Sequence, residues 1–391
     1  MKRKLIAILG STGSIGKSAL KIVERDKNFK VYLISANLNF NEICNQIKHF
    51  NPEKIVIKNY DIFVRVKKKF KKYSNKIYNN YDSITNIKKK IDYTISAIPG
   101  ISGLEPTLDF VKISKNVLLA NKESIVCGWS LINNLSKKFK CNLIPIDSEH
   151  FSINQLLKKY SINEIEKIYI TASGGPFLKL PINKFKKIKL KQAIKHPKWN
   201  MGKKISIDSA TLANKVLEIS EALKIFPFKI NFYKIIIHPE ALIHAVIKLK
   251  NGFSILLYHL PDMKIPIANA LQSKYFFSSS YKILQKNSPD IQNLSFYEVE
   301  NNRYPIVSLM HKINYSNSSL IVFNAANEIF VDQFLKKNID FIDISRYLKL
   351  VINSKKYIKL SNMKCDNLGQ ILKIDHLARN MSMEIIKKKN D

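Results

Sequence analysis

Three glycines that follow an apolar segment constrain the fold more than any other feature of this 391-residue chain. Lys4–Leu9 is β-prone, the loop Gly10-Ser-Thr-Gly13-Ser-Ile-Gly16 follows it, and Lys17–Glu24 has helical spacing. Such a turn needs glycines where backbone approaches a pyrophosphate, and the helix N-terminus offers free N–H groups to the anion. The spacing is a variant of the commoner G-x-G-x-x-G, and a plain tight turn is the alternative. We therefore expect the chain to begin with a dinucleotide-binding unit.

Short apolar strands alternate with helical stretches up to about Asp147, which is typical of a doubly wound parallel sheet. We expect this Rossmann-like NADP-binding domain over 1–147, an α+β catalytic domain over 148–272, a connector over 273–299 and a helical domain over 300–391. The expected strands are Lys4–Leu9, Lys30–Ser35, Lys54–Ile57, Tyr93–Ala97, Asn116–Leu119, Asn142–Ile146, Tyr233–Ile237, Ala245–Leu249 and Ser254–Tyr258. The expected later helices are Ser209–Leu223, Ile306–Ile313, Ser319–Phe334, Asp340–Asn353 and Leu368–Ile386.

The formal net charge of +35 raises the question of a polyanionic partner. Lysine is spread along the whole chain together with much Ile and Asn, which indicates compositional drift, and no basic–aromatic stripe predicts nucleic-acid binding. The four scattered cysteines fit reduced thiols in the cytoplasm. No apolar run is long enough to span a bilayer, and the apolar stretch after Met1 is too short for a signal peptide, so we expect no membrane partner.

The residues after the second expected strand bear on the choice of dinucleotide. NAD sites usually place an Asp or Glu there to hold the ribose 2′-hydroxyl. The segment from Leu33 through Asn37 and Leu38 to Asn39 holds no acid. Because a carboxylate would repel a 2′-phosphate, its absence favours NADP.

A cluster of carboxylates follows the strand that ends at Ile146. Strand geometry would put Asp147 and Glu149 on one side, where two like charges repel unless a cation joins them. Glu218 stands further on, within a helical pattern. These three residues would make an all-oxygen site suited to Mg²⁺ or Mn²⁺. An exposed strand end and a solvated helix face are the alternative.

Two clusters combine hydroxyl groups, backbone N–H groups and a cation, which suits a phosphate monoester. Ser173 is followed by two glycines, and Ser209 precedes Asn214 and Lys215. A turn and a helix cap are the structural alternatives. Between the clusters, the segment from His196 to Gly202 looks like a loop that could close over a ligand through Trp199 and Met201.

Taken in order, these segments resemble the 1-deoxy-D-xylulose 5-phosphate reductoisomerase family over essentially the whole chain. The segments that carry the resemblance are Gly10–Gly16, Ala120-Asn-Lys-Glu-Ser124, Pro145-Ile-Asp-Ser-Glu-His150, Ser173-Gly-Gly-Pro-Phe177, His196–Thr211, Asn214-Lys-Val-Leu-Glu218 and Asn324-Ala-Ala-Asn-Glu328. The resemblance implies a cytoplasmic homodimeric enzyme that rearranges its phosphorylated substrate to an aldehyde. The aldehyde is then reduced with NADPH to 2-C-methyl-D-erythritol 4-phosphate, in the non-mevalonate isoprenoid pathway. A divalent ion, Mg²⁺, Mn²⁺ or Co²⁺, is required.

The resemblance also implies roles for individual residues. Asp147, Glu149 and Glu218 would hold the metal, and Lys122, Glu149 and Glu218 would be catalytic. The implied substrate contacts are Lys122, Ser148, Glu149, Ser173, His196, Ser209, Asn214, Lys215 and Glu218. The implied cofactor contacts are Thr12, Gly13, Ser14, Ile15, Asn37, Asn39, Asn121, Glu123 and Gly202. Trp199 and Met201 look like the lid over the substrate.

The chain departs from the family pattern at two places. Asn37 and Leu38 stand where a glycine and a basic residue are usual, and Leu38 cannot pair with a 2′-phosphate. His259 stands where a glycine is usual. Two other functions stay open: an NAD(P)-dependent dehydrogenase without rearrangement, which needs no three-carboxylate site, and a basic nucleic-acid-binding protein with a relict dehydrogenase fold.

Overall fold

A computed structural model describes residues 3–82, 84, 90–199, 201–273 and 293–390. The described chain divides into two compact units, each with its own sheet. The first takes its residues from 1–124, 130–151 and 263–289, and the second from 125–129, 152–262 and 290–391. Most of the expected connector 273–299 lies outside the described residues.

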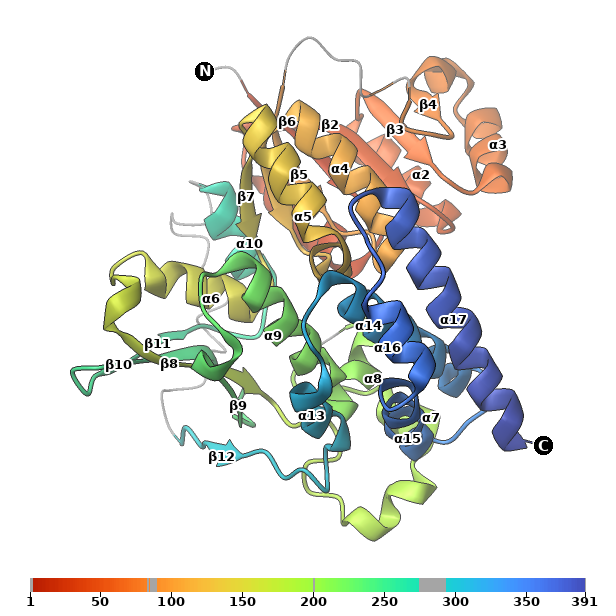
Figure 1. Ribbon diagram of the computed structural model, residues 1–391. Helices are drawn as coiled ribbons and strands as arrows, with labels where there is room; N and C mark the ends of the chain where they lie inside the picture. The colour runs from red at the N-terminus through yellow and green to blue at the C-terminus, as the bar shows by residue number, and fades with distance from the viewer. Residues whose placement is uncertain (1–2, 83, 85–89, 200, 274–292, 391) are drawn as a thin grey trace. The chain divides into compact units, whose positions relative to one another are not determined.

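A seven-stranded parallel sheet forms the centre of the first unit (Figure 1), in the order β4-β3-β2-β1-β5-β6-β7. The chain moves outward from β1 to β4 on one side and from β5 to β7 on the other, which confirms the prediction of a doubly wound sheet. The strands are β1 (Lys4–Leu9), β2 (Phe29–Ala36), β3 (Lys54–Ile57), β4 (Ile77–Tyr78), β5 (Ile91–Ser96), β6 (Ser114–Leu119) and β7 (Asn142–Pro145).

The alternation of side chains along β1 explains why this strand is apolar throughout. Ile6 and Ile8 pack into a core with helices α1, α2 and α10, and Ala7 and Leu9 pack into another that includes Phe110 of α4. A strand buried on both faces has no polar face to show, as parallel sheets require. The helices of this unit are α1 (Ser14–Arg25), α2 (Phe40–Phe50), α3 (Tyr60–Lys69), α4 (Leu104–Ile113), α5 (Lys122–Phe139) and α10 (Lys264–Leu271), and α6 (Ser148–Leu157) begins here.

Helix α10 belongs to the first unit and not to the catalytic domain in which we expected its residues. The expected boundaries put its residues at the end of the catalytic domain, whereas Ile267 and Leu271 are fully buried in the core beside α1 of the first unit. Ser273, which follows α10, donates a hydrogen bond of 2.7 Å from its Oγ to Asp26 at the end of α1. The chain therefore returns to the first unit long after β7 ends.

A five-stranded mixed sheet forms part of the second unit, in the order β11-β10-β8-β9-β12. Only the β8–β9 pair is parallel among these described strands; the other neighbours run antiparallel. The strands are β8 (Ile165–Ala172), β9 (Tyr233–Ile237), β10 (Ile243–Leu249), β11 (Ser254–Tyr258) and β12 (Tyr297–Glu298). An apolar core covers this sheet with Ile219 and Ala222 of α9. The sequence pattern predicted β9, β10 and β11 but not β8.

The remaining helices of the second unit gather around α14, which packs on α15, α16 and α17. They are α7 (Leu190–Ala193), α8 (Lys203–Thr211), α9 (Ala213–Ile225), α13 (Pro305–Ser308), α14 (Asn317–Leu335), α15 (Phe341–Ile352), α16 (Lys355–Ser361) and α17 (Leu368–Asn390). The sequence pattern predicted α9, α13, α14, α15 and α17, whereas α7, α8 and α16 were not predicted. In the described part of the chain, every helix is too short or too polar to cross a membrane.

The expected helix Ser209–Leu223 is wrong at its start. Ser209 lies in the last turn of α8, and a new helix, α9, begins at Ala213. Between them Leu212 adopts a left-handed conformation with φ of 59°, while its side chain is buried in the apolar core. Core burial holds leucine in a backbone conformation that it rarely adopts. The break turns the chain between Ser209 and Lys215.

Candidate active site

The glycine loop lies where β1 ends, beside the point at which the strand order changes direction. Gly10 has φ of +83°, and a Cβ there would lie 2.6 Å from the carbonyl oxygen of Ala97 after β5. Only glycine fits, because it has no Cβ to strain or clash. The backbone N–H groups of Gly10 and Ser11 donate to the Ser35 carbonyl of β2 at 3.1 and 2.8 Å. The loop is thus hydrogen-bonded to β2 and packs closely against the segment after β5.

Four predicted cofactor contacts, Thr12 to Ile15, are exposed or half-buried at the start of α1. The first N–H groups of a helix have no partner within the helix, and the helix dipole favours an anion there. Nearby, after β2, Asn37 and Asn39 are exposed. This edge of the first unit has the geometry of a dinucleotide pyrophosphate site.

Leu38 presents an exposed apolar side chain directly before α2, with an exposed fraction of 66%. Asn39 caps α2 by accepting a hydrogen bond of 3.1 Å from the backbone N–H of Glu42. The absence of an acid between β2 and α2 is thus accompanied by the absence of a cation at Leu38.

Strands β6 and β7 lie side by side, so their carboxyl ends bring two predicted site segments together. Lys122, the first residue of α5, forms an ion pair of 3.0 Å from its Nζ to Oδ2 of Asp147, and its side chain is buried. Beside this pair, Ser148 donates a hydrogen bond of 2.5 Å to Oε2 of Glu149. Because the carboxyl ends of parallel strands share one edge of the sheet, this polar cluster and the glycine loop lie along the same edge.

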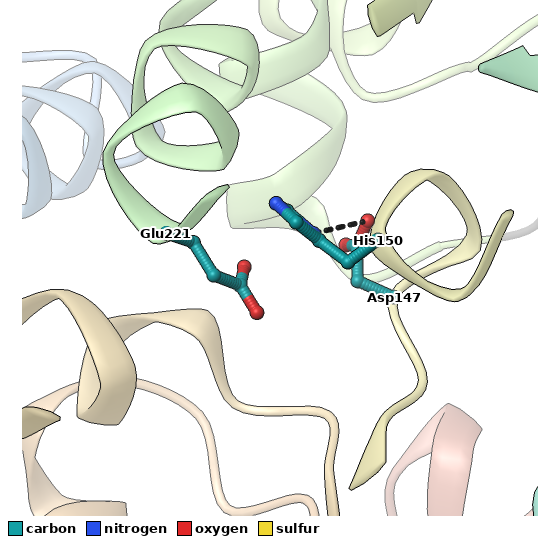
Figure 2. Close-up of side chains that lie close together, drawn as sticks. All are labelled: Asp147, His150 and Glu221. Carbon is teal, nitrogen blue, oxygen red and sulfur yellow. Dashed lines mark hydrogen bonds and ion pairs between the residues drawn. The ribbon is translucent and has the colours of Figure 1, made fainter. Parts of the chain in front are cut away.

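The sequence analysis gave no role to His150, which is fully buried and contacts Asp147. Its Nδ1 lies 3.3 Å from Oδ1 of Asp147 (Figure 2), three residues before it. The same figure draws Glu221 of α9, in the second unit. Asp147 therefore has a cationic and an imidazole neighbour within the first unit. The spacing of three residues at a helix start could have identified His150.

Both polar atoms of the Asn121 side chain form hydrogen bonds within the first unit. Its Oδ1 accepts a hydrogen bond of 2.8 Å from the backbone N–H of Ser124, and its Nδ2 donates to the carbonyls of Ile98 and Gly100. Asn121 thus caps α5 and holds the loop after β5, at the edge where the glycine loop lies. Glu123, in the first turn of α5, is buried.

In the second unit, the Ser-Gly-Gly segment after β8 packs tightly on α8. Gly175 has φ of +67°, and a Cβ there would lie 2.9 Å from Cα of Ala210 and 3.1 Å from the carbonyl oxygen of Ser209. Tyr304 holds the loop from the other side by donating a hydrogen bond of 2.7 Å to the Gly174 carbonyl. The two hydroxyl clusters predicted from sequence, at Ser173 and Ser209, therefore lie on neighbouring segments.

His196 joins the following loop to this cluster in one defined tautomer. Its Nδ1 accepts the backbone N–H groups of Lys198 and Trp199 at 3.1 and 2.9 Å, so its Nε2 carries the proton and donates to Ser173 Oγ at 2.9 Å. Burial, with Lys215 as a lesser cause, lowers the pKa of His196 to about 4. The imidazole is therefore neutral near pH 7 and acts as a hydrogen-bond donor.

Asn214, Lys215 and Glu218 form a polar group on one side of α9, in which Lys215 and Glu218 are buried. Lys215 Nζ lies 2.7 Å from Oε2 of Glu218, and the side-chain amide of Asn214 donates to the other carboxylate oxygen. Spacings of three and four residues bring these side chains together on the helix. Glu218 has an exposed fraction of only 1%, so its charge depends on these donors.

The predicted site residues thus gather in two clusters, one in each unit. The first holds the glycine loop, Lys122, Asp147 and Glu149; the second holds Ser173, His196, Ser209, Lys215 and Glu218. Gly202, a predicted cofactor contact, precedes α8 in the second unit. That Glu218 joins Asp147 and Glu149 around one ion, and that Gly202 reaches the cofactor, stay predictions.

The parallel sheet with a glycine loop at its switch point defines a dinucleotide-binding α/β enzyme, and the second cluster has the chemistry of an anion site. Three protein-family models match the chain. The model of 1-deoxy-D-xylulose 5-phosphate reductoisomerase matches residues 6–128, and two models of the C-terminal domain of that enzyme match residues 143–226 and 259–381. A Pelagibacter ubique protein of that name is 44% identical over 94% of this chain and 96% of its own length. One from Wolbachia sp. subsp. Brugia malayi is 38% identical over 99% and 98%.

Solved structures give the same answer. A crystal structure of DOX-P reductoisomerase with NADPH, fosmidomycin and magnesium has a TM-score of 0.89 at 29% identity, covering 99% of each chain. The enzyme from Zymomonas mobilis in complex with NADPH has a TM-score of 0.82 at 29% identity, covering 98% of this chain and 99% of that one. The chain belongs to the 1-deoxy-D-xylulose 5-phosphate reductoisomerase family, which confirms the resemblance drawn from its motifs.

Proposed function

We propose that this protein converts 1-deoxy-D-xylulose 5-phosphate to 2-C-methyl-D-erythritol 4-phosphate with NADPH and a divalent cation. The observation that carries the proposal is the preservation of both clusters in a chain of this family: Lys122 paired with Asp147 in one, and His196, Ser173 and Lys215 in the other. An ordinary dehydrogenase would not need the buried carboxylates. Family membership favours the reductoisomerase over that alternative.

The first unit would bind the dinucleotide at the N-terminus of α1, with Thr12 to Ile15 around the pyrophosphate. NADPH supplies the hydride for the reduction step when it is bound. The relatives solved with NADPH support this assignment, as does the lack of an acid after β2.

Asp147, Glu149 and Glu218 would hold the divalent cation, and the donor set suits it. Carboxylate oxygens are the ligands that Mg²⁺ and Mn²⁺ prefer, and Glu149 and Glu218 are too deeply buried to be solvated as bare anions. When bound, the cation supplies Lewis acidity at the vicinal oxygens of the substrate. Lys122 and His150 orient Asp147 from within the first unit, and Ser148 orients Glu149.

Lys122 would contact a reacting hydroxyl of the substrate. Its ammonium group is buried against Asp147, so it can donate a hydrogen bond to a substrate oxygen without first shedding bulk water. The phosphate would lie against Ser173, His196, Ser209, Asn214 and Lys215. The neutral imidazole of His196 offers a proton donor at Nε2 without adding charge, and Lys215 supplies the cation.

The decisive experiment measures NADPH oxidation with 1-deoxy-D-xylulose 5-phosphate, with and without a chelator, and repeats it with NADH. We expect turnover that the chelator removes and Mg²⁺ or Mn²⁺ restores. Glu218→Gln should abolish turnover at ordinary Mg²⁺ levels, while Glu166→Gln, which loses only a surface pair with Lys248, should not. Full activity of Glu218→Gln would refute the metal assignment, and salt-sensitive RNA or DNA binding without NADPH oxidation would favour the nucleic-acid alternative.

Two lysines on α9 provide a test of the phosphate assignment and its matched control. Lys215→Gln should raise the KM for the substrate by roughly 10- to 100-fold, because a charge-assisted hydrogen bond is lost. Lys224→Gln removes a half-buried lysine of the same helix, which donates to the Tyr315 carbonyl and to Asn317. It should lower the free energy of unfolding and leave KM unchanged. Equal KM effects in both variants would refute the assignment.

We also propose that the enzyme works in the cytoplasm as a homodimer. Three of its four thiols are buried and all are free, which suits a reducing compartment. The edge strand β11 exposes Leu256 beside the exposed Phe253, which gives a second copy an apolar edge to cover. Analytical ultracentrifugation should give twice the chain mass of 45.1 kDa.

A further inference from the structure

Two histidines of the second unit form a buried stacked pair that the proposed reaction does not use. The rings of His244, on β10, and His259, directly after β11, have centroids 3.9 Å apart and an interplanar angle of 16°. Their exposed fractions are 2% and 7%. By the resemblance described above, His259 stands where a glycine is usual in the family.

The backbone polar groups of His259 and one of its two ring nitrogens form hydrogen bonds. Its backbone N–H donates to the Leu242 carbonyl at 2.9 Å, and its Nδ1 donates to the Leu260 carbonyl at 2.8 Å. Its own carbonyl lies 3.3 Å from Nε2 of His244. The remaining ring nitrogen, Nε2, is buried without a hydrogen-bond partner among the described residues. Burial lowers the pKa of His259, in keeping with a neutral ring held for its flat surface.

His244 also contacts Trp199, in the loop that we assign to the substrate lid. The indole meets the His244 ring edge-on, with centroids 5.9 Å apart and an interplanar angle of 71°. The backbone N–H of Trp199 is held by His196, which contacts Ser173. Trp199 is therefore fixed at its backbone by a predicted phosphate ligand and at its side chain by His244.

We infer that His259 is a positioning residue for Trp199: it stacks on His244 and thereby fixes the surface against which the indole packs. A ring that could tilt would offer Trp199 no defined edge, because an aromatic pair depends on the mutual orientation of its rings. The inference rests on the proposed function only for its effect on substrate binding. Its effect on the indole itself can be observed without substrate.

The test uses tryptophan fluorescence, since the chain has two tryptophans and Trp129→Phe leaves Trp199 alone. In that background, His259→Leu keeps a bulky apolar group and removes the flat ring, and His259→Phe keeps the ring. We expect His259→Leu to raise the acrylamide quenching constant of Trp199 about twofold and the substrate KM about fivefold, the effect of losing one aromatic contact. The Kd for NADPH should stay unchanged, and His259→Phe should restore both values.

Ile247→Val, on the same strand as His244, controls for general loosening of the fold, because Ile247 is fully buried. It should lower Tm without changing the quenching constant. The inference is overturned if His259→Leu leaves quenching unchanged, if His259→Phe behaves like His259→Leu, or if Ile247→Val also raises quenching. An unmodified chain that fails to turn over 1-deoxy-D-xylulose 5-phosphate would instead overturn the proposed function, and the quenching comparison would still decide the role of His259.

Discussion

Leu38 is an exposed residue between β2 and α2 at which this chain departs from the family pattern. Its exposed side chain occupies the position between β2 and α2 where a cation would meet the 2′-phosphate. Leu38→Lys should lower the KM for NADPH about fivefold, as one exposed ion pair allows, and leave the KM for NADH unchanged. Leu38→Gln is the uncharged control. Equal changes for both dinucleotides would show that this position does not meet the 2′-phosphate.

A second prediction at the residue scale concerns His196 and the pH dependence of folding stability. Its pKa is about 4 in the folded protein, against an ordinary value of 6.5, so the unfolded chain takes up the proton first as pH falls. The neutral ring therefore stabilises the fold fully above pH 6.5, and this contribution is lost progressively between pH 6.5 and 4. Urea unfolding of His196→Gln should show a smaller loss of stability over that range than the unmodified chain.

A control histidine is available on α17. His376 is exposed, so His376→Gln removes a histidine without opening a buried site and serves as the control variant. If both variants lose the same part of the slope, or if neither does, His196 is not the group that links stability to pH. The role of such a residue is hard to assign from sequence, because the shift in its pKa comes from burial, which the local sequence does not display.

At the scale of elements, the loop after β8 depends on contact between backbones. Gly175→Ala must place a Cβ 2.9 Å from Ala210 of α8 in a left-handed conformation, which should cost about 3 kcal/mol of unfolding free energy and raise the substrate KM. Gly252→Ala is the matched control, since Gly252 also has positive φ, at +91°, and a Cβ added there would meet no atom within 4 Å. It should cost about 1 kcal/mol and leave KM unchanged. Equal costs would mean that backbone conformation, not contact with α8, requires glycine.

The bounds of a helix or strand could be predicted from sequence where its residues are buried uniformly. The strand Lys4–Leu9 was predicted at its true bounds, because a strand covered on both faces is apolar at every position. The break at Leu212 was not, because leucine has no local preference for positive φ and only core packing imposes it. Strand β8 was missed because Glu166 and Lys167, which lie outside the core, interrupt its apolar pattern.

At the scale of the whole molecule, the proximity of two site residues could be predicted from sequence where they share a strand edge or a helix face. Lys122 and Asp147 follow neighbouring parallel strands, and Lys215 and Glu218 are three residues apart on α9. Local geometry carries no information on how Glu218 would meet Asp147, which lies far earlier in the chain. Their shared carboxylate chemistry suggested the link, and the family motifs supported it. His150 was missed although its spacing of three residues from Asp147 could have identified it, because that spacing gives no sign of its complete burial.

The net charge of +35 has a consequence that only the whole chain can produce. A field of this sign should draw the phosphorylated substrate inward and raise its rate of association. Salt screens this field, with a Debye length of about 10 Å at 0.1 M, so raising KCl from about 50 to 500 mM should lower kcat/KM roughly tenfold. The value of kcat at saturating substrate should stay constant, because chemistry within the site does not depend on steering. Potassium acetate should act like chloride, whereas sulfate should inhibit further by competing at Lys215. A kcat/KM that is independent of salt would assign the lysine excess to composition alone, with no part in the encounter.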